Sequence, residues 1–276
     1  MPSNWTAKLI AAALLLGVLG GGAYYWWRNR APAMPPQLVQ SEPPPPSSSP
    51  ASAPPAVRHP IDPAASAPDG EAASAPDLER QVADALAVLL GRQNLLTFLQ
   101  PERFIRQAVA TVDALGREIA PPRLWPVVPT PGRFVTAERD GVQRIADTNA
   151  QRYGPFVRFA TTVDPARAAA LYKRYYPHFQ AAYEELGYPG KYFNDRLVDV
   201  IDLLLATPEP AGPLPVVLTQ VKGPIPVAQP WTRYEFADPA LEARPAGQKI
   251  LLRLGVDHAR QLKAQLRAFR AEIARP

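Results

Sequence analysis

Apolar side chains recur at helical spacing over most of the chain after residue 76, and this pattern predicts a mostly helical domain. In the clearest stripe the apolar positions fall at i, i+3, i+4, i+7 and i+8, which places them on one face of a helix. The stripe consists of Leu197, Val200, Ile201, Leu204 and Leu205. Similar spacing predicts helices from residue 77 onward to the end of the chain.

Short polar residues and prolines mark the predicted helix ends. Asp164 followed by Pro165 is a favoured pair at a helix start, the first as N-cap and the second in the opening turn. Pro101 predicts another start, and Asn194 predicts another N-cap. Pro177 lies inside a helical stripe, where its missing N–H and its ring predict a kink.

Short runs rich in β-branched and aromatic residues predict one or two small β-hairpins within this helical domain. Residues 134–136 and 142–145 flank Asp140-Gly141, a dipeptide that favours a tight hairpin turn. Residues 216–219 and 233–236 predict a second strand pair. The expected fold class is therefore mainly α (α+β), with a globular domain over residues 77–276.

A stretch without charge near the N-terminus predicts a membrane anchor. After a short tail of residues 1–8, residues 9–27 would span about 28 Å as a helix, close to the thickness of a hydrocarbon core. Aromatic residues stand at both ends, as in interfacial belts. The alternative is a cleaved signal peptide ending at Ala31-Pro32-Ala33, but four bulky aromatics and two arginines precede that site.

The flanks of this segment nearly balance in positive charge, with the α-amine and Lys8 on one side and Arg28 and Arg30 on the other. The short tail without acidic residues favours an N-terminus inside and a domain outside. In a bacterial inner membrane with an outer membrane beyond it, the C-terminal domain would be periplasmic.

Small residues recur every four positions in the same segment, at Ala13, Gly17 and Gly21. This spacing lets two helices approach closely and predicts a possible homodimer face. The alternative is that glycine is simply frequent in spanning helices.

The segment that follows the anchor is rich in proline, alanine and serine. Fourteen of the 35 prolines lie between residues 31 and 76, where large aliphatic side chains are scarce. Such composition cannot form a core, so we predict a disordered linker over residues 28–76. An extended spacer of about 3.1 Å per residue is the favoured interpretation, and a proline-rich ligand for a recognition domain is the alternative.

Several classes of chemistry are excluded by absent residue types. The chain has no cysteine, and all eight serines lie before residue 75, so the domain lacks thiol and serine nucleophiles. Only His178 and His258 lie after residue 76, and no glycine-rich nucleotide motif occurs. We therefore expect no cofactor and no metal. The domain holds 26 Lys+Arg against 21 Asp+Glu, too mild a bias to indicate nucleic acid.

Two charged groups have competing interpretations. Arg260, Lys263, Arg267 and Arg270 share a face of the last predicted helix, which is either solvated or suited to anionic lipid or an acidic partner. A second group follows a helical repeat and comprises Asp195, Asp199 and Asp202, with Glu184 and Glu185 shortly before.

These carboxylates would suit a divalent cation or an acid/base pair for glycan cleavage. The structural alternative is that Asp195 stabilises the first turn of its helix and that Arg196 pairs with Asp199. His178 follows a proline on an aromatic stripe, which indicates a packed or surface histidine.

Several long motifs resemble a known family. The runs 104–113, 171–189, 192–209, 236–242 and 246–249 resemble the bacterial family catalogued as domain of unknown function 3014. The resemblance implies a membrane-anchored envelope protein with a proline-rich spacer, and it implies no activity. Polar residues of the motifs and the helix stripe are the candidate binding residues: Arg106, Asp113, Arg152, Tyr153, Tyr183, Glu184, Asn194, Asp195, Arg196, Asp199, Gln248 and Lys249.

Together these observations favour a non-enzymatic binding or scaffold module tethered to the inner membrane. Its expected partner is another envelope protein or peptidoglycan. The alternative hypothesis is a carboxylate-dependent hydrolase of cell-wall glycan, which requires two acids across an open cleft. A third interpretation is that the polar motif residues form an internal network.

Overall fold

The computed structural model describes residues 56–62, 75–219 and 230–274, and all of them lie in one compact unit of the chain. The predicted membrane segment, its possible dimer face and most of the linker lie outside the described residues. Within the described ranges, no helix has both the length and the apolar character needed to cross a membrane.

The described domain is mostly helical, as the apolar spacing predicts. Its α-helices are α2 (Ala75–Leu90), α3 (Arg92–Phe98), α4 (Phe104–Leu115), α5 (Gly154–Thr162), α6 (Pro165–Arg174), α7 (Tyr176–Glu185), α8 (Phe193–Leu205), α9 (Pro239–Glu242), α10 (Ala246–Leu254) and α11 (Val256–Ile273). Short 3₁₀ turns occur at η2 (Pro122–Leu124), η3 (Asp147–Tyr153) and η4 (Pro230–Thr232).

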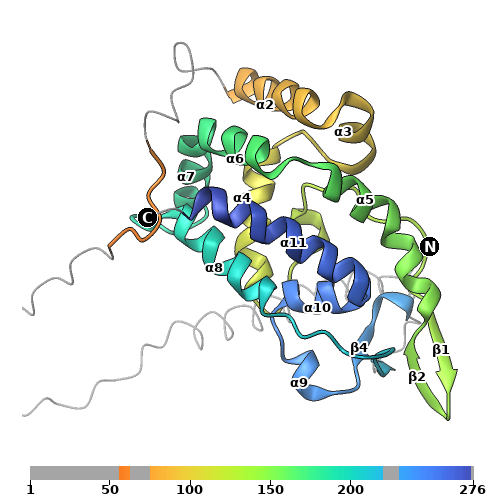
Figure 1. Cartoon of the computed structure of the whole chain (residues 1–276). Coiled ribbons are helices and arrows are strands. Elements are labelled where there is room, and N and C mark those ends of the chain that lie inside the picture. Colours follow the sequence, from red (N-terminus) through yellow and green to blue (C-terminus); the bar gives the residue numbers. More distant parts are fainter. Residues whose placement is uncertain (1–55, 63–74, 220–229, 275–276) are drawn as a thin grey trace, which may run out of the picture. The chain divides into compact units, whose positions relative to one another are not determined.

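Two helices organise the packing (Figure 1). The C-terminal helix α11 contacts α5, α6, α8 and α10, whereas α4 contacts α7, α8 and α10. Gly247 of α10 lies so close to α4 and α8 that an added Cβ would meet Leu204 Cδ2 at 2.6 Å and the Leu115 carbonyl oxygen at 3.1 Å. A glycine is therefore required where α10 crosses these helices.

Aromatic rings form much of the main core. Tyr172 packs edge to face against Tyr176 and Phe179, and Phe179 stacks on Phe193. All four rings belong to or contact one buried cluster. Tyr172 and Tyr176 therefore contribute their rings to the core, which is the apolar role expected of rings on a helical stripe.

Both predicted strand pairs are present. β1 (Thr136–Arg139) pairs antiparallel with β2 (Val142–Ile145), and Asp140 and Gly141 both have positive φ, as this tight turn requires. β3 (Val216–Leu218) pairs antiparallel with β4 (Tyr234–Phe236). The mainly α expectation with two small hairpins is confirmed for the described domain.

Two predicted helix features are wrong in detail. At Pro177 the chain does not kink one helix but divides it, because α6 ends at Arg174 and α7 begins at Tyr176 with the proline in its first turn. Pro101 does not start α4, which begins at Phe104 after Arg103 adopts a left-handed conformation. Asp164 is confirmed as an N-cap, since its carboxylate accepts the Arg167 N–H at 2.9 Å.

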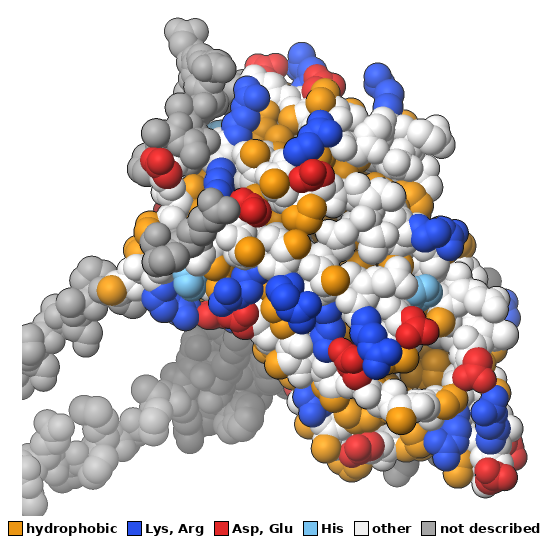
Figure 2. Space-filling view, in the orientation of Figure 1, with side chains coloured by type: hydrophobic (Ala, Val, Ile, Leu, Met, Phe, Trp, Pro, Cys, Tyr) orange, Lys and Arg blue, Asp and Glu red, His pale blue; other side chains and the backbone are white. Residues whose placement is uncertain are grey.

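The predicted basic face of α11 is largely engaged in ion pairs. Lys263 is only 6% exposed, and its Nζ contacts the Thr207 carbonyl oxygen at 2.6 Å and Glu209 at 2.9 Å. Arg270 pairs with Asp202 at 2.5 Å. In Figure 2 basic side chains on this face have acidic ones beside them. The solvated-face interpretation is therefore wrong for Lys263, because its ammonium group is buried against a carbonyl and a carboxylate.

Candidate functional site

A short segment of the predicted linker contacts the domain at the start of α8. Residues 56–62, called the strap from here on, run beside α7 and α8 (orange in Figure 1). The side chains that contact the strap through polar groups form the docking surface: Tyr192, Asn194, Asp195 and Asp199. The predicted linker over residues 28–76 thus includes a segment attached to the folded domain.

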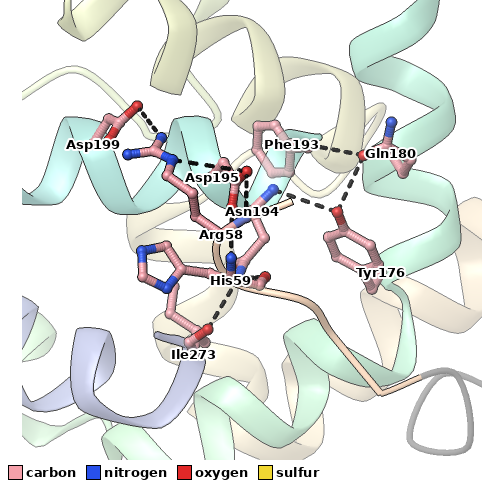
Figure 3. Close-up of polar contacts among 9 residues, drawn as sticks. All are labelled: Arg58, His59, Tyr176, Gln180, Phe193, Asn194, Asp195, Asp199 and Ile273. Carbon is pink, nitrogen blue, oxygen red and sulfur yellow. Dashed lines mark hydrogen bonds and ion pairs between the residues drawn. The ribbon is translucent and has the colours of Figure 1, made fainter. Parts of the chain in front are cut away.

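Asp195 binds the strap backbone through both carboxylate oxygens (Figure 3). Its Oδ2 accepts the Arg58 N–H at 3.0 Å, and its Oδ1 accepts the His59 N–H at 2.8 Å. The residue also lies in the first turn of α8, where a negative charge interacts favourably with the helix dipole. Two successive peptide N–H groups are thereby held by one carboxylate.

Asn194 is fully buried and connects three segments. Its Nδ2 donates to the His59 and Ile273 carbonyl oxygens, each at 2.9 Å, and its Oδ1 accepts the Tyr172 hydroxyl at 3.0 Å. Burial raises the pKa of Tyr172 well above its ordinary value, so its hydroxyl stays protonated and donates. The predicted N-cap role of Asn194 is wrong: Tyr192 is the N-cap, because the amide of Asn194 is occupied inside the core.

Three further contacts complete the attachment. The Ile61 N–H donates to the Tyr192 hydroxyl at 2.8 Å, and the Ile61 side chain is buried in the main core cluster. The Arg58 guanidinium donates to Asp199 at 2.7 Å, and this hydrogen bond raises the pKa of Arg58. Sequence reasoning missed Ile61 because one aliphatic residue among prolines and alanines barely changes the composition of its surroundings.

Each of the five candidate acids has a partner within the domain. Asp195 and Asp199 share Arg58, while Asp202 pairs with Arg270. Glu184 accepts a hydrogen bond from Gln180, and Glu185 pairs with Arg106 at 3.1 Å. The predicted Arg196–Asp199 pair is not formed. This arrangement does not favour the glycan-hydrolase hypothesis, which needs two carboxyl groups facing an open cleft.

A second polar cluster surrounds Asp113, which is 5% exposed. Its carboxylate contacts the Arg117 guanidinium at 2.6 Å and the Arg196 guanidinium at 3.3 Å. It also accepts the Tyr188 hydroxyl at 3.2 Å, and Tyr188 stacks on the buried ring of Tyr183. Arg196 therefore joins α8 to α4, because its side chain reaches a buried carboxylate and the Asp113 carbonyl oxygen.

A third cluster joins α10 to its neighbours. Gln248 donates to the Leu203 carbonyl oxygen at 2.7 Å. Lys249, 9% exposed, contacts Glu242 at 2.8 Å, and the other oxygen of Glu242 accepts the Phe236 N–H at 2.9 Å. Gln248 thus binds a backbone carbonyl group of α8, and Lys249 neutralises the partly buried carboxylate of Glu242.

Glu242 makes a pH-dependent contribution to stability. Burial raises its pKa, but hydrogen bonds from Lys249 and the Phe236 N–H outweigh burial, so the net pKa lies below its ordinary 4.5. Replacing Glu242 with Gln should lower the free energy of unfolding at pH 7 by about 1 kcal/mol. The difference from wild type should disappear as pH falls below 4.5 through the folded pKa. Urea unfolding from pH 7 to pH 3 measures it, with exposed Glu118→Gln as the control; a constant difference would contradict it.

Arg152 and Tyr153 form a fourth cluster beside the first hairpin. Arg152 donates to the carbonyl oxygens of Pro131 and Gly132 at 3.2 and 3.1 Å, and its guanidinium lies 5.3 Å from the ring centre of Tyr153. It also contacts the fully buried Asn149, which accepts the Val135 N–H. Ten of the twelve candidate residues therefore divide among four clusters, while Arg106 pairs with Glu185 and Glu184 accepts from Gln180 outside them. The structure brings Asn194, Asp195 and Asp199 together at the docking surface.

A small cavity of about 200 Å³ lies between α2, α4 and α7. Its wall is mainly apolar, and Arg103, Arg106, Glu185 and His178 also line it. His178 is half-buried, between the packed and surface positions that the sequence leaves open, and this partial burial lowers its pKa. Within the described ranges, no group of three or more His, Asp or Glu side chains is arranged to hold a metal ion.

Comparison with known proteins gives one match. The model of a family described as "Protein of unknown function (DUF3014)" matches residues 104–270. Neither the curated proteins nor the solved structures contain a match to this chain. The matched range includes the docking surface and the Asp113 cluster and excludes the strap.

Proposed function

This chain belongs to the DUF3014 family of proteins of unknown function, and from that premise we propose that it is a non-catalytic binding module at the bacterial inner membrane. Residues 9–27 anchor it, the proline-rich linker spaces it from the bilayer, and the helical domain binds an envelope component. The uncharged segment and its aromatic ends support the anchor.

The observation that carries this proposal is how the domain uses its polar side chains. At the docking surface Asp195 and Asn194 hold the N–H and C=O groups of a bent segment. The candidate acids Asp199 and Asp202 end in ion pairs with arginine. The backbone contacts of Asp195 and Asn194 are those of a binding surface, and ion pairs occupy Asp199 and Asp202. Binding is therefore the function that this chemistry favours.

The test is capture by the tagged full chain from detergent-solubilised envelopes. We expect one envelope protein or peptidoglycan to be enriched on the wild-type chain and not on an anchor-linker fragment of residues 1–55. Equal enrichment on both would contradict a binding role for the domain. A reporter active only outside the cytoplasm, fused after Pro276, should be active; an inactive but well-expressed fusion would reverse the proposed orientation.

A further inference from the structure

We propose that the docking surface is a recognition site for a short peptide segment of a partner protein, which binds in place of the strap with the same bend. This inference rests on the proposed binding function and names the chemistry of the partner. The segment it fits has a basic residue followed, three positions later, by an aliphatic residue.

The chemistry of the docking surface is directed mainly at the backbone. Asp195 accepts two successive N–H groups, the Tyr192 hydroxyl accepts a third, and the Asn194 amide donates to a carbonyl. A peptide segment that adopts the bend found at Arg58 and His59 offers these groups at the same spacing. Backbone hydrogen bonds that provide affinity, with a few side-chain positions that provide specificity, are a recurring mode of peptide recognition.

The strap is attached through few side chains. Ile61 is 7% exposed, whereas Val57 is 47% exposed and the Arg58 side chain is 55% exposed. Pro60 is exposed as well. One buried aliphatic side chain, the exposed Arg58–Asp199 ion pair and a set of backbone hydrogen bonds oppose the entropy of ordering the whole segment. The strap is therefore suited to exchange with a similar segment.

Asn194 and the start of α8 are held by contacts that do not involve the strap. Asn194 is held by Tyr172 and by the Ile273 carbonyl oxygen, and its N–H donates to the Tyr176 hydroxyl. Gln180 fixes Tyr176 and the Phe193 N–H at the same helix start (Figure 3). A preorganised surface loses little freedom when a segment binds.

The family match favours a partner segment as the occupant. The matched residues 104–270 contain Tyr192, Asn194, Asp195 and Asp199, whereas residues 56–62 lie outside them. The surface thus belongs to the part of the chain that defines the family, and the strap does not. Two contacts select the sequence of the partner segment. Asp199 pairs with its basic residue, as it does with Arg58, and its aliphatic residue fills the buried position that Ile61 occupies.

The test uses the full chain and a fluorescent synthetic peptide with the sequence of Ala56–Asp62. Because a tethered segment competes at an effective concentration on the order of millimolar, wild type should bind the peptide weakly. The variant Arg58→Ala with Ile61→Asp should bind it at least tenfold more tightly. Adding Asp195→Ala to that variant should remove the gain, whereas Asp202→Ala on the same helix should change affinity less than twofold. A peptide with Asp in place of the isoleucine should not bind.

Two results would overturn the inference. A folded double variant that binds the peptide no better than wild type would show that the strap is a fixed part of the domain. Wild-type dimers that the peptide dissociates would show that the occupant is a second copy of this chain. If the double variant does not fold, Arg58→Ala alone should still bind about threefold more tightly. If the peptide test fails while envelope capture succeeds, only the proposed peptide site is rejected. If the peptide test succeeds while envelope capture fails, only the proposed envelope function is rejected.

Discussion

Replacing Asn194 with leucine should lower the free energy of unfolding by about 4 kcal/mol, a large fraction of the stability of a domain. The side chains are similar in volume, so the effect comes from lost hydrogen bonds. The substitution leaves the buried Tyr172 hydroxyl and the carbonyl oxygens of His59 and Ile273 without this partner. Each buried polar group left unpaired costs about 1–3 kcal/mol. Urea unfolding of the two proteins measures the difference.

A double variant separates this cause from a general packing defect. In wild type, Tyr172→Phe removes a hydroxyl that donates to Asn194 and should be destabilising. In the Asn194→Leu protein the same hydroxyl has lost that acceptor, so Tyr172→Phe should be neutral or stabilising. Asn94→Leu on the exposed side of α3 is the control and should change stability by less than about 0.5 kcal/mol. Additive effects of the two core substitutions would contradict the hydrogen-bond account.

Local sequence patterns are sufficient to predict most of the helices and both hairpins, because apolar spacing marks the helices and β-rich runs mark the strands. The stripe ending at Leu205 lies in α8, and the Asp140-Gly141 turn joins β1 and β2. Both signals are local, because a helical stripe and a tight turn each depend on residues a few positions apart. At Pro177 the sequence predicts only a kink. It does not show whether tertiary packing keeps the segments before and after the proline in one helix or separates them into α6 and α7.

The sequence shows that the candidate residues are polar members of motifs, but it does not show which groups they contact. Arg196 was expected to pair with Asp199 one turn away, yet it contacts Asp113 of α4, 83 residues earlier in the chain. Asn194 has the composition of an N-cap and instead serves a buried network. In both cases a distant buried group outcompetes the local helix contact. Such choices depend on tertiary packing, which spacing along one helix does not encode.

Replacing Asp113 with alanine should lower the free energy of unfolding by about 3 kcal/mol. The carboxylate is 7% exposed and lies between two guanidinium groups, so its loss leaves Arg117 and Arg196 facing each other with no charge between them. Removing one member of a buried ion pair costs about 3–5 kcal/mol. The lower end applies because the Arg117 side chain is 57% exposed and can turn into water.

Charge repulsion in the Asp113→Ala protein gives this prediction a specific signature. A further Arg117→Ala substitution should restore part of the lost stability, although Arg117→Ala alone should destabilise wild type. Thermal unfolding at low and high salt provides a second measurement, because added salt should raise the melting temperature of Asp113→Ala more than that of wild type. The exposed pair Arg106–Glu185 supplies the control, and Glu185→Ala should change stability by less than about 0.5 kcal/mol. If Arg117→Ala destabilises wild type and the Asp113→Ala protein equally, the Asp113 carboxylate acts through packing alone. Its ion pairs would then not hold α4 against α8.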